Sequence, residues 1–384
     1  MYDRRTFLTH AGAAGALFAA APHIAVAQAA TDRRFVFVIQ RGAADGLGTL
    51  APTGDPAFAG LRGAFAQDFA GGMRAGDFFT LHPNLAEAGR MFAAREALFV
   101  HAVASPYRDR SHFDGQNILE TGGNAAYVLR DGWMNRLLGL LPGGQSRAIA
   151  VSATVPMVLR GGREVASYAP SALPDASDDL LARVSSLYES DPQLHGAWAQ
   201  AMQTRTMAGD MSGGGGQNGA ATGQLAARLL SGAEGARIAV IESGGWDTHA
   251  GQRARLGLQL RGLDAMLGAL KTGLGADWAN TLVLVATEFG RTAAPNGTGG
   301  TDHGTASLAM LYGGAVAGGR VIADWPGLAQ GALHEGRDLK PTLDLDTLIA
   351  SAVAQHYRLD MGRSGRTLFP NMAGARGVEG LIRT

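Results

Sequence analysis

The stretch Phe35-Val36-Phe37-Val38-Ile39 is apolar at every position and rich in β-branched residues. A strand with one face in water alternates apolar and polar residues, whereas an uninterrupted apolar run is typical of a strand buried on both faces of a parallel sheet. Runs of the same character recur at 97–103, 148–151, 237–241, 281–286 and 306–312. The sequence therefore predicts a sheet that is covered on both sides.

Helical patterns separate several of these runs. Between 256 and 270, leucines recur at three- and four-residue spacing, which places one apolar stripe along a helix. A closing helix is expected over 345–357, with Asp344 or Asp346 at its acidic start. Strands that alternate with such helices predict an α/β fold with a doubly wound, mostly parallel sheet and helices on both faces.

The first 30 residues have the pattern of a signal peptide for the twin-arginine route. Arg4 and Arg5 precede an Ala-rich apolar stretch, and the small residues Ala25 and Ala27 are placed as a cleavage site. We expect export by the twin-arginine translocase and a periplasmic or secreted location; the alternative is a chance arginine pair before an N-terminal helix. Residues 31–384 are expected to form a single domain, with a flexible Gly-rich loop near 207–222 that serves as a linker or a lid.

Composition excludes several classes of function. The chain has 33 basic and 33 acidic residues, so no net field would attract nucleic acid or a membrane surface. It has no cysteine, which excludes disulfides, thiolate metal sites and a cysteine nucleophile. After residue 30, no segment reaches the ~18 consecutive apolar residues of a membrane span. Any metal ion must therefore be bound by His, Asp, Glu or hydroxyl ligands.

Polar clusters adjoin the predicted strands. In open α/β sheets, ligands bind outside the carboxyl ends of the strands, and acidic or His-bearing segments lie there at 41–46, 105–114, 242–249, 287–291 and 301–304. Each segment alone is explained by a turn, a surface loop or a helix cap. Together they predict one shared site. That site would be a metal site or an acid/base site, and the acidic and imidazole residues available to it include Asp45, His112, Asp247, His249, Glu288, Asp302 and His303.

Oxygen and imidazole ligands suit one or two divalent ions of Zn, Mn, Mg or Ca. Two ions ~4 Å apart would hold the attacking and leaving oxygens of an ester displacement. Ser111 precedes a helical stretch, so it is either a nucleophile beside the anion-favouring N–H groups of a helix start or a simple N-cap. Arg41, Arg110 and Arg291 are candidates to bind a substrate oxyanion or, alternatively, to hold site carboxylates in place.

The most specific motifs are Leu81-His82-Pro83, Arg110-Ser111-His112-Phe113, Gly245-Trp246-Asp247-Thr248-His249, Thr287-Glu288-Phe289-Gly290-Arg291 and Thr301-Asp302-His303-Gly304. On these motifs the chain resembles the DUF1501 family of twin-arginine-exported proteins, within the alkaline phosphatase and sulfatase-like superfamily. The resemblance spans 36 to about 325. It implies an alkaline phosphatase-like fold and a metal-dependent hydrolase that acts on phosphate, or related sulfate or phosphodiester, groups of a small-molecule or glycan ester.

Matched by motif, the resemblance implies Ser111 as nucleophile. One metal ion would be bound by Asp247, His249 and His303, and a second by Asp45 and Glu288. Alkaline phosphatases have Asp-His where this chain has Glu288-Phe289, so one imidazole is missing unless His112, His82 or Asp302 replaces it. Ala104 stands two residues before Pro106, where a sulfatase has Cys or Ser, so a formylglycine mechanism is excluded.

Two further functions remain open on the same fold. The chain could be a non-catalytic metal-binding envelope or assembly factor, which the Phe289 departure favours. Alternatively, it could be a transferase that moves a phosphate-bearing head group onto a glycan.

Overall fold

The computed structural model describes residues 31–141, 148–169, 178–188, 191–208, 218–372 and 376–383. The expected signal peptide, 1–30, lies outside the described residues. So does the centre of the Gly-rich segment, 209–217. On either side of that centre, α8 (Pro192–Ala208) ends and α9 (Gly219–Leu230) begins.

The first strand, β1 (Arg34–Gln40), lies in the middle of the main sheet, and every one of its residues is buried. It pairs in parallel with β8 (Ile238–Ser243) on one side and with β9 (Thr281–Thr287) on the other. In this register, Phe37 lies between Val240 and Leu284. The prediction of a strand buried on both faces is confirmed.

The main sheet has nine strands in the described residues, in the order β11-β5-β10-β9-β1-β8-β6-β7, with β12 also paired to β5. The strands not yet given are β5 (Ala97–Ala104), β6 (Ala148–Val151), β7 (Ala166–Ser167), β10 (Ser307–Tyr312), β11 (Arg320–Ile322) and β12 (Leu343–Asp344). Of these described strands only β10 runs antiparallel to its neighbours, so the mostly parallel sheet is confirmed. Because of that reversal, β10 starts at the edge where the parallel strands end.

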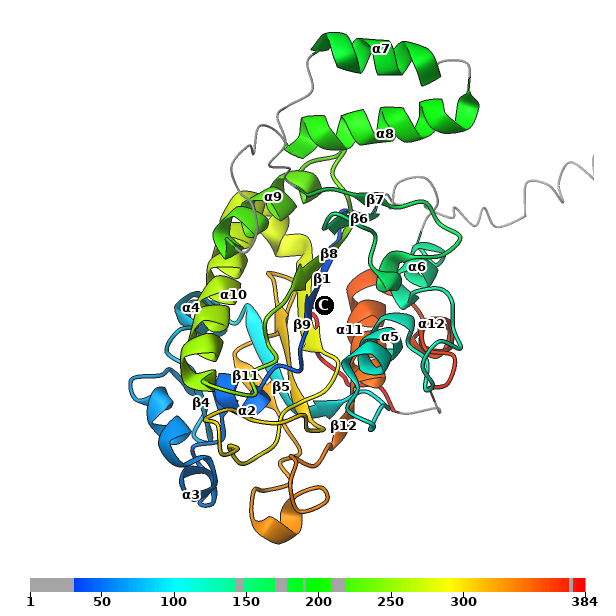
Figure 1. The fold of residues 1–384 in the computed structure, drawn as a ribbon. Helices are drawn as coiled ribbons and strands as arrows, with labels where there is room; N and C mark the ends of the chain where they lie inside the picture. The colour runs from blue at the N-terminus through cyan, green and yellow to red at the C-terminus, as the bar shows by residue number, and fades with distance from the viewer. Residues whose placement is uncertain are drawn as a thin grey trace, which may run out of the picture. The chain divides into compact units, whose positions relative to one another are not determined.

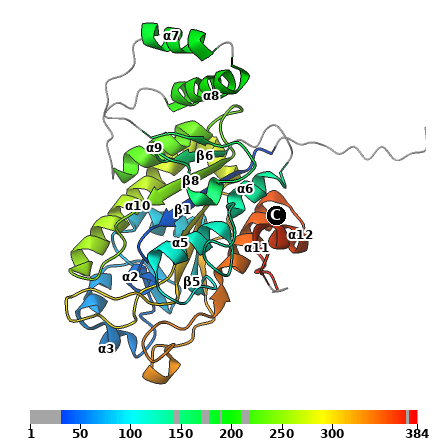
Figure 2. The same ribbon diagram turned by 45° about the vertical axis from the view of Figure 1, so that its right-hand side comes forward.

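Helices cover both faces of the sheet (Figures 1 and 2). Val36 and Val38 point into one apolar core, whereas Phe35, Phe37 and Ile39 point into the other. The first core is closed by α9 together with α4 (Ala86–Ala93) and α10 (Gln252–Leu274), and the second by α5 (His112–Thr121), α6 (Trp133–Leu138), α11 (Leu345–Tyr357) and α12 (Met361–Leu368). The predicted α/β class is therefore confirmed.

The expected closing helix is α11, and its start is set by Asp344. The Asp344 carboxylate accepts a hydrogen bond from the Thr347 backbone N–H at 2.7 Å, which satisfies one free donor of the first turn. Asp346, the other candidate, is buried within the helix.

The described residues also form further, mostly short elements. They are α2 (Gly46–Thr49), β2 (Leu50–Ala51), α3 (Phe58–Arg62), η1 (Gly63–Phe69), β3 (Arg74–Ala75), β4 (Phe79–Leu81), η2 (Met157–Leu159), α7 (Asp178–Tyr188), η3 (Gly275–Asn280) and η4 (Gln330–Ala332). Strands β2, β4 and β3 form a separate three-stranded sheet. Among the described helices, none combines the length and apolar character needed to cross a membrane.

Candidate functional site

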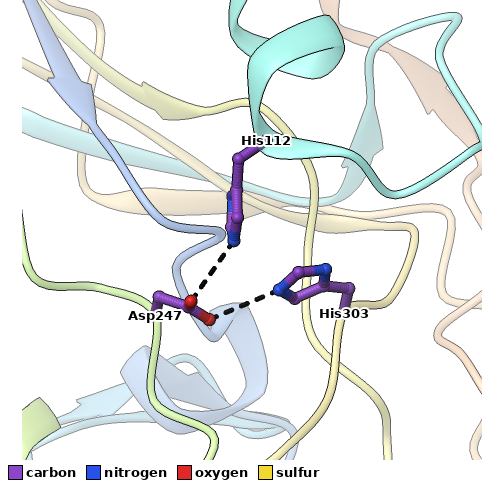
Figure 3. A group of neighbouring side chains, drawn as sticks. All are labelled: His112, Asp247 and His303. Atoms are coloured by element: carbon purple, nitrogen blue, oxygen red, sulfur yellow. Dashed lines mark ion pairs between the residues drawn. The ribbon is translucent and has the colours of Figure 1, made fainter.

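Three side chains from distant parts of the chain point toward one another at one edge of the sheet: His112, Asp247 and His303 (Figure 3). The Nε2 atom of His112 lies 3.4 Å from Asp247 Oδ2, and the Nε2 atom of His303 lies 3.4 Å from Asp247 Oδ1. All three ligand atoms lie within 4.8 Å of one another. The rings of His112 and His303 meet edge to face, with centroids 4.3 Å apart.

The sheet topology brings these residues together. His112 begins α5 after the end of β5, Asp247 lies in the loop after β8, and His303 lies in the loop before the reversed strand β10. Two glycines let the loops touch. A Cβ on Gly42 would lie 2.6 Å from the Asp247 backbone nitrogen, and one on Gly290 would lie 1.9 Å from the Ala306 carbonyl oxygen. Larger residues at these positions would force the loops apart.

A fourth side chain, His249, reaches the same point. Its Nε2 atom lies 2.9 Å from His303 Nε2 and 3.0 Å from Asp247 Oδ1. Four ligands at zinc-like bond lengths in a tetrahedron are separated by about 3.3 Å. The separations within the set of Asp247, His249 and His303, and that between His112 and Asp247, are 2.9 to 3.4 Å and surround that value.

The opposite nitrogen of each imidazole faces a hydrogen-bond acceptor. These contacts are His112 Nδ1 to Glu288 Oε1 at 2.9 Å, His249 Nδ1 to Asp302 Oδ1 at 3.0 Å, and His303 Nδ1 to the Arg110 carbonyl at 2.9 Å. Since a carboxylate or carbonyl oxygen only accepts, each ring is assigned its proton on Nδ1. Each Nε2 is therefore left with a lone pair, and the three lone pairs converge.

His112 gives independent evidence of a missing partner. Its Nε2 atom is buried and has no hydrogen-bond partner among the described residues. A buried polar atom without a partner is rare in native proteins and costs free energy unless an ion or water completes it. The donor set and this orphaned nitrogen therefore fit a divalent metal ion.

The two best-connected carboxylates are held in their charged form. Burial raises the pKa of Glu288, but hydrogen bonds from His112, backbone N–H groups and Thr287 outweigh it, and the pKa lies below its usual value. Burial likewise opposes ionisation of Asp247, yet the Arg291 guanidinium, with Nη1 at 2.6 Å from Oδ1, lowers its pKa overall. Both groups therefore remain anionic near neutral pH.

The imidazoles differ in their affinity for protons. The hydrogen bond to Glu288 raises the pKa of His112 above its ordinary value, despite burial. Burial lowers the pKa of His303, and the nearby charges of His112 and Arg291 act in the same direction. In the metal-free protein, a proton therefore competes for the site mainly at His112.

Of the predicted metal ligands, His112, Asp247, His249 and His303 converge. Glu288 and Asp302 lie one step outside, where each accepts a hydrogen bond from an imidazole of the cluster. Such outer carboxylates orient ligating histidines and raise their basicity.

Asp45 has different partners from those expected of a metal ligand. Its carboxylate is ion-paired with Arg62 and accepts hydrogen bonds from Gln252 Nε2 at 2.5 Å and from the Gly48 backbone N–H at 3.0 Å. The side chains of Asp45 and Arg62 are each only 1% exposed. In the structure, Asp45 is therefore a buried anchor and the N-cap of α2.

The three candidate arginines are all paired with carboxylates. Arg291 holds Asp247 through the contact given above, and its own side chain is fully buried. The partners of the other two are Glu120 and Glu242 for Arg41, and Asp338 and Glu335 for Arg110. Of the two roles left open by the sequence, the structure gives Arg291 that of holding a site carboxylate.

Ser111 is the N-cap residue of α5, but its side chain makes no capping hydrogen bond. Its neighbours on both sides contact the cluster, since Arg110 supplies the carbonyl that faces His303 and His112 supplies a ligand nitrogen. The Tyr107 hydroxyl accepts from the Ser111 backbone N–H at 3.0 Å and lies 3.4 Å from Asp114 Oδ2. The serine thus lies beside the cluster, in contact with Tyr107.

Phe289 packs against two imidazoles of the cluster, His112 and His303. The rings of His112 and Phe289 are nearly parallel, with centroids 5.1 Å apart and planes 23° apart. His82, another candidate replacement, instead packs edge-on against Phe69, and its Nδ1 accepts from the Asn84 backbone N–H at 3.1 Å. His82 is therefore a packed residue before α4, which was one of its two interpretations.

Gln252 is one residue of this region that the sequence did not indicate. It is fully buried; besides its bond to Asp45, its Oε1 accepts from Thr248 Oγ1 at 2.9 Å and from Thr301 Oγ1 at 2.5 Å. It therefore ties the loops of Asp247 and His303 to the segment after β1. A glutamine at the start of a helix gives no sequence signal of this role.

We expect Asp45→Asn to lower the free energy of unfolding by about 3 kcal/mol, because removing one member of a buried pair leaves the other charge uncompensated. Denaturant unfolding measures this. Asp68→Asn is the control, since it breaks the Arg253 pair, which is much more exposed, and a far smaller loss is expected. Equal losses in the two variants would contradict the anchoring role of Asp45.

We expect Asp302→Asn to weaken Zn²⁺ binding by about 10- to 100-fold through loss of its hold on His249. His249→Gln should weaken it further, because a ligand itself is removed. Chelator-competition titration gives both affinities. His195→Gln, an exposed histidine on α8, is the matched control and should bind as the unmodified protein does. Unchanged affinity in His249→Gln would exclude His249 as a ligand.

Zn²⁺ affinity should fall as the pH drops, because the ligating imidazoles must be neutral. Since the pKa of His112 is raised by Glu288, the fall should begin above the ordinary histidine pKa of about 6.5. In Glu288→Gln, the onset should move to lower pH. Titrations between about pH 5 and 8 measure this, and an onset that does not move would show that Glu288 does not control the competing proton.

Several solved structures are similar to this chain at low sequence identity. The comparison with curated proteins finds no match. Similar solved structures include an alkaline phosphatase from the Antarctic bacterium TAB5, with 13% identity, coverage of 75% of this chain and 94% of that chain, and a TM-score of 0.36. The C-terminal periplasmic domain of EcEptC from Escherichia coli, in complex with Zn, has 8% identity, 74% coverage of each chain and a TM-score of 0.31. Ps i-CgsB in complex with k-i-k-neocarrahexaose has 9% identity, coverage of 88% and 76%, and a TM-score of 0.36.

These scores are too low to bear on the chemistry of the site. The family model described as "Protein of unknown function (DUF1501)" matches residues 94–368, which include α5 and the loops of Asp247 and His303. The expected family is thereby confirmed, and the chain belongs to DUF1501.

Proposed function

We propose that this protein is an exported, metal-dependent hydrolase of phosphate or related esters, with Ser111 as the attacking residue. The observation that supports it best is the cluster of His112, Asp247 and His303, whose ligand atoms lie within 4.8 Å of one another, with His249 Nε2 in contact with both Asp247 and His303. Each imidazole is oriented by its own outer acceptor, which is how metal-binding histidines are normally held.

The donor set favours Zn²⁺ among the candidate ions. Three nitrogens and one carboxylate oxygen suit zinc, whereas Mg²⁺ and Ca²⁺ prefer sites made of oxygen ligands. The set also favours one ion over two. Of the two carboxylates assigned to a second ion, Asp45 is ion-paired with Arg62. The other, Glu288, accepts hydrogen bonds from His112 and from the Gly42 backbone N–H.

A bound divalent ion would supply Lewis-acid polarisation of the ester oxygen. His112, His249, His303 and Asp247 would hold it, and buried Arg291 would fix Asp247 in position. These side chains come from loops that are joined by buried hydrogen bonds, so little reorganisation is needed when substrate binds.

The attack itself is assigned to Ser111. Its hydroxyl proton leaves by way of Tyr107 toward the Asp114 carboxylate, to which the Tyr107 hydroxyl is linked at 3.4 Å. The Oγ–P bond forms as the P–O bond to the alcohol breaks, and the departing alcohol takes up the proton. Water then breaks the Oγ–P bond, which restores the serine and releases the phosphate product.

The proposed place of action is outside the cytoplasm, on the basis of the arginine pair and apolar stretch in the first 30 residues. The metal-binding assembly factor remains the competing function, because it needs the same cluster but no nucleophile. The glycan head-group transferase needs the nucleophile and an acceptor sugar.

Ser111→Ala separates the proposal from a non-catalytic role. We expect a loss of at least about 100-fold in ester hydrolysis, in line with other catalytic groups, and no change in Zn²⁺ affinity. Hydrolysis of a panel of p-nitrophenyl esters in the presence of Zn²⁺ gives the first quantity, and metal titration the second. Thr298→Ala removes an exposed hydroxyl that donates to the His249 backbone carbonyl at 2.6 Å, so it is the control for general effects on the loops around the cluster.

Full activity in Ser111→Ala would remove the serine from the mechanism. No zinc-dependent turnover of any ester by the unmodified protein, combined with tight metal binding, would favour the assembly factor. Transfer to an added acceptor sugar, detected by product analysis, would favour the transferase.

A further inference from the structure

The electrostatics of the site indicate which ester it accepts, an inference that rests on the proposed function. The three arginines that the sequence offers as candidates for substrate binding are each already paired with one or two carboxylates. A fourth, Arg337, donates to the His303 carbonyl at 2.6 Å and is paired with Asp338, which Arg110 also contacts. These guanidinium groups would have to leave an existing ion pair before they could bind a substrate oxyanion.

Arg291 is the least able to do so. Its guanidinium is ion-paired with the carboxylate of Asp247, its side chain is fully buried, and it also donates to the hydroxyl and the carbonyl of Thr301. Turning this fully buried group toward a substrate would break its ion pair with Asp247 and its hydrogen bonds to Thr301, which costs free energy. Its charge therefore belongs to the site and not to the substrate.

With a divalent ion in place, the charges of the site cancel. The two positive charges of the ion and the one of Arg291 are matched by the carboxylates of Asp247, Asp302 and Glu288. A phosphate monoester, which has two negative charges near neutral pH, would add two unmatched charges. An ester with one negative charge adds only one unmatched charge, and the partial positive charge at the start of α5 partly offsets that charge.

The rim of the site adds a second feature. Phe113, the residue after His112, is 82% exposed, and Tyr127, whose hydroxyl interacts with Asp114, is 62% exposed. Exposed aromatic rings next to a polar site offer apolar surface for an organic group. A phosphodiester has two organic groups on one phosphorus, and one can rest on this surface while the other leaves.

We propose that the site is specific for singly charged phosphodiesters and discriminates against phosphate monoesters. Arg41, Arg110, Arg291 and Arg337 are already paired with carboxylates and are not free to bind a second charge, and the exposed rings of Phe113 and Tyr127 receive the second organic group.

Binding to the Zn²⁺-saturated Ser111→Ala protein tests the charge preference without any turnover. Diethyl phosphate, a single anion, should bind at least about tenfold more tightly than inorganic phosphate near pH 8, where the latter is mainly a dianion. Isothermal titration measures both. Equal or tighter binding of inorganic phosphate would overturn the proposal, whether or not the protein is an enzyme.

Turnover tests the two features separately. Relative to p-nitrophenyl phosphate, kcat/KM for bis(p-nitrophenyl) phosphate should be at least about tenfold higher. It should also exceed that for p-nitrophenyl sulfate, which has the same single charge but lacks the second group. A preference for the monoester or for the sulfate would contradict the proposal, whereas zinc-dependent turnover of either would still support the proposed function.

Two variants test which residues cause the preference for the diester over the monoester. Glu242→Gln removes one of the two partners of Arg41 and should raise kcat/KM for the monoester relative to the diester, which a purely structural role would not do. Phe113→Ala should raise KM for the diester with little change in kcat. Leu187→Ala, an exposed apolar residue of α7, is the control and should leave both constants unchanged. If neither Glu242→Gln nor Phe113→Ala alters the ratio between diester and monoester, the specificity has another source.

Discussion

The structure around the candidate site depends on one buried polar junction, formed by Asp45, Arg62 and Gln252. A carboxylate only accepts hydrogen bonds, so the amide nitrogen of Gln252 must face Asp45, and its oxygen is left for the hydroxyls of Thr248 and Thr301. Arg62 further donates to backbone carbonyls at 292 and 293. One junction thus joins the loops that follow β1 and β8 to the segment between β9 and β10. Because an unpaired buried charge or amide is costly, these loops can adopt only arrangements that keep the junction complete.

The imidazoles of the cluster are also held by hydrogen bonds, to oxygen atoms that lie just outside the cluster. Each ring donates its Nδ1 proton to one oxygen. For His112 this is the buried carboxylate of Glu288, for His249 the carboxylate of Asp302, which Asn296 also contacts, and for His303 the Arg110 carbonyl. These acceptors set both the direction of the ring and the nitrogen that is left free. Without them, the rings could rotate, and two facing imidazole nitrogens 2.9 Å apart would have no reason to persist. The site is therefore preorganised by groups that would not touch the ion.

The balance of charges connects this architecture with chemistry. The site uses its arginines to hold carboxylates, and it uses its carboxylates to hold arginines and histidines. That arrangement keeps a dense group of charges in the folded state at little electrostatic cost, but it leaves few unpaired charges for a ligand. In the proposed function, a substrate would meet chiefly the ion, the start of α5 with Ser111, and the exposed ring of Phe113.

Much of the fold was predictable because its causes are local. The apolar run of β1, the leucine stripe of α10 and the acidic cap of α11 follow from side-chain periodicity and capping, which depend on near neighbours along the chain. The clustering of His112, Asp247, His249 and His303 was also predictable, because parallel strands end at a common edge. The direction of β10 was not, since a fully buried strand has the same apolar run whichever way it points.

The sequence by itself thus determined the family, the layered fold and the set of polar residues that gather at one edge. Only the tertiary structure decided which of them face a common point and which stand behind it. Glu288 and Asp302 have the same chemistry as Asp247, and a difference of a few ångströms separates a ligand from the acceptor that orients a ligand. That distance is set by contacts between loops far apart in the chain, through residues such as Gln252 and Arg62 whose role has no local signature.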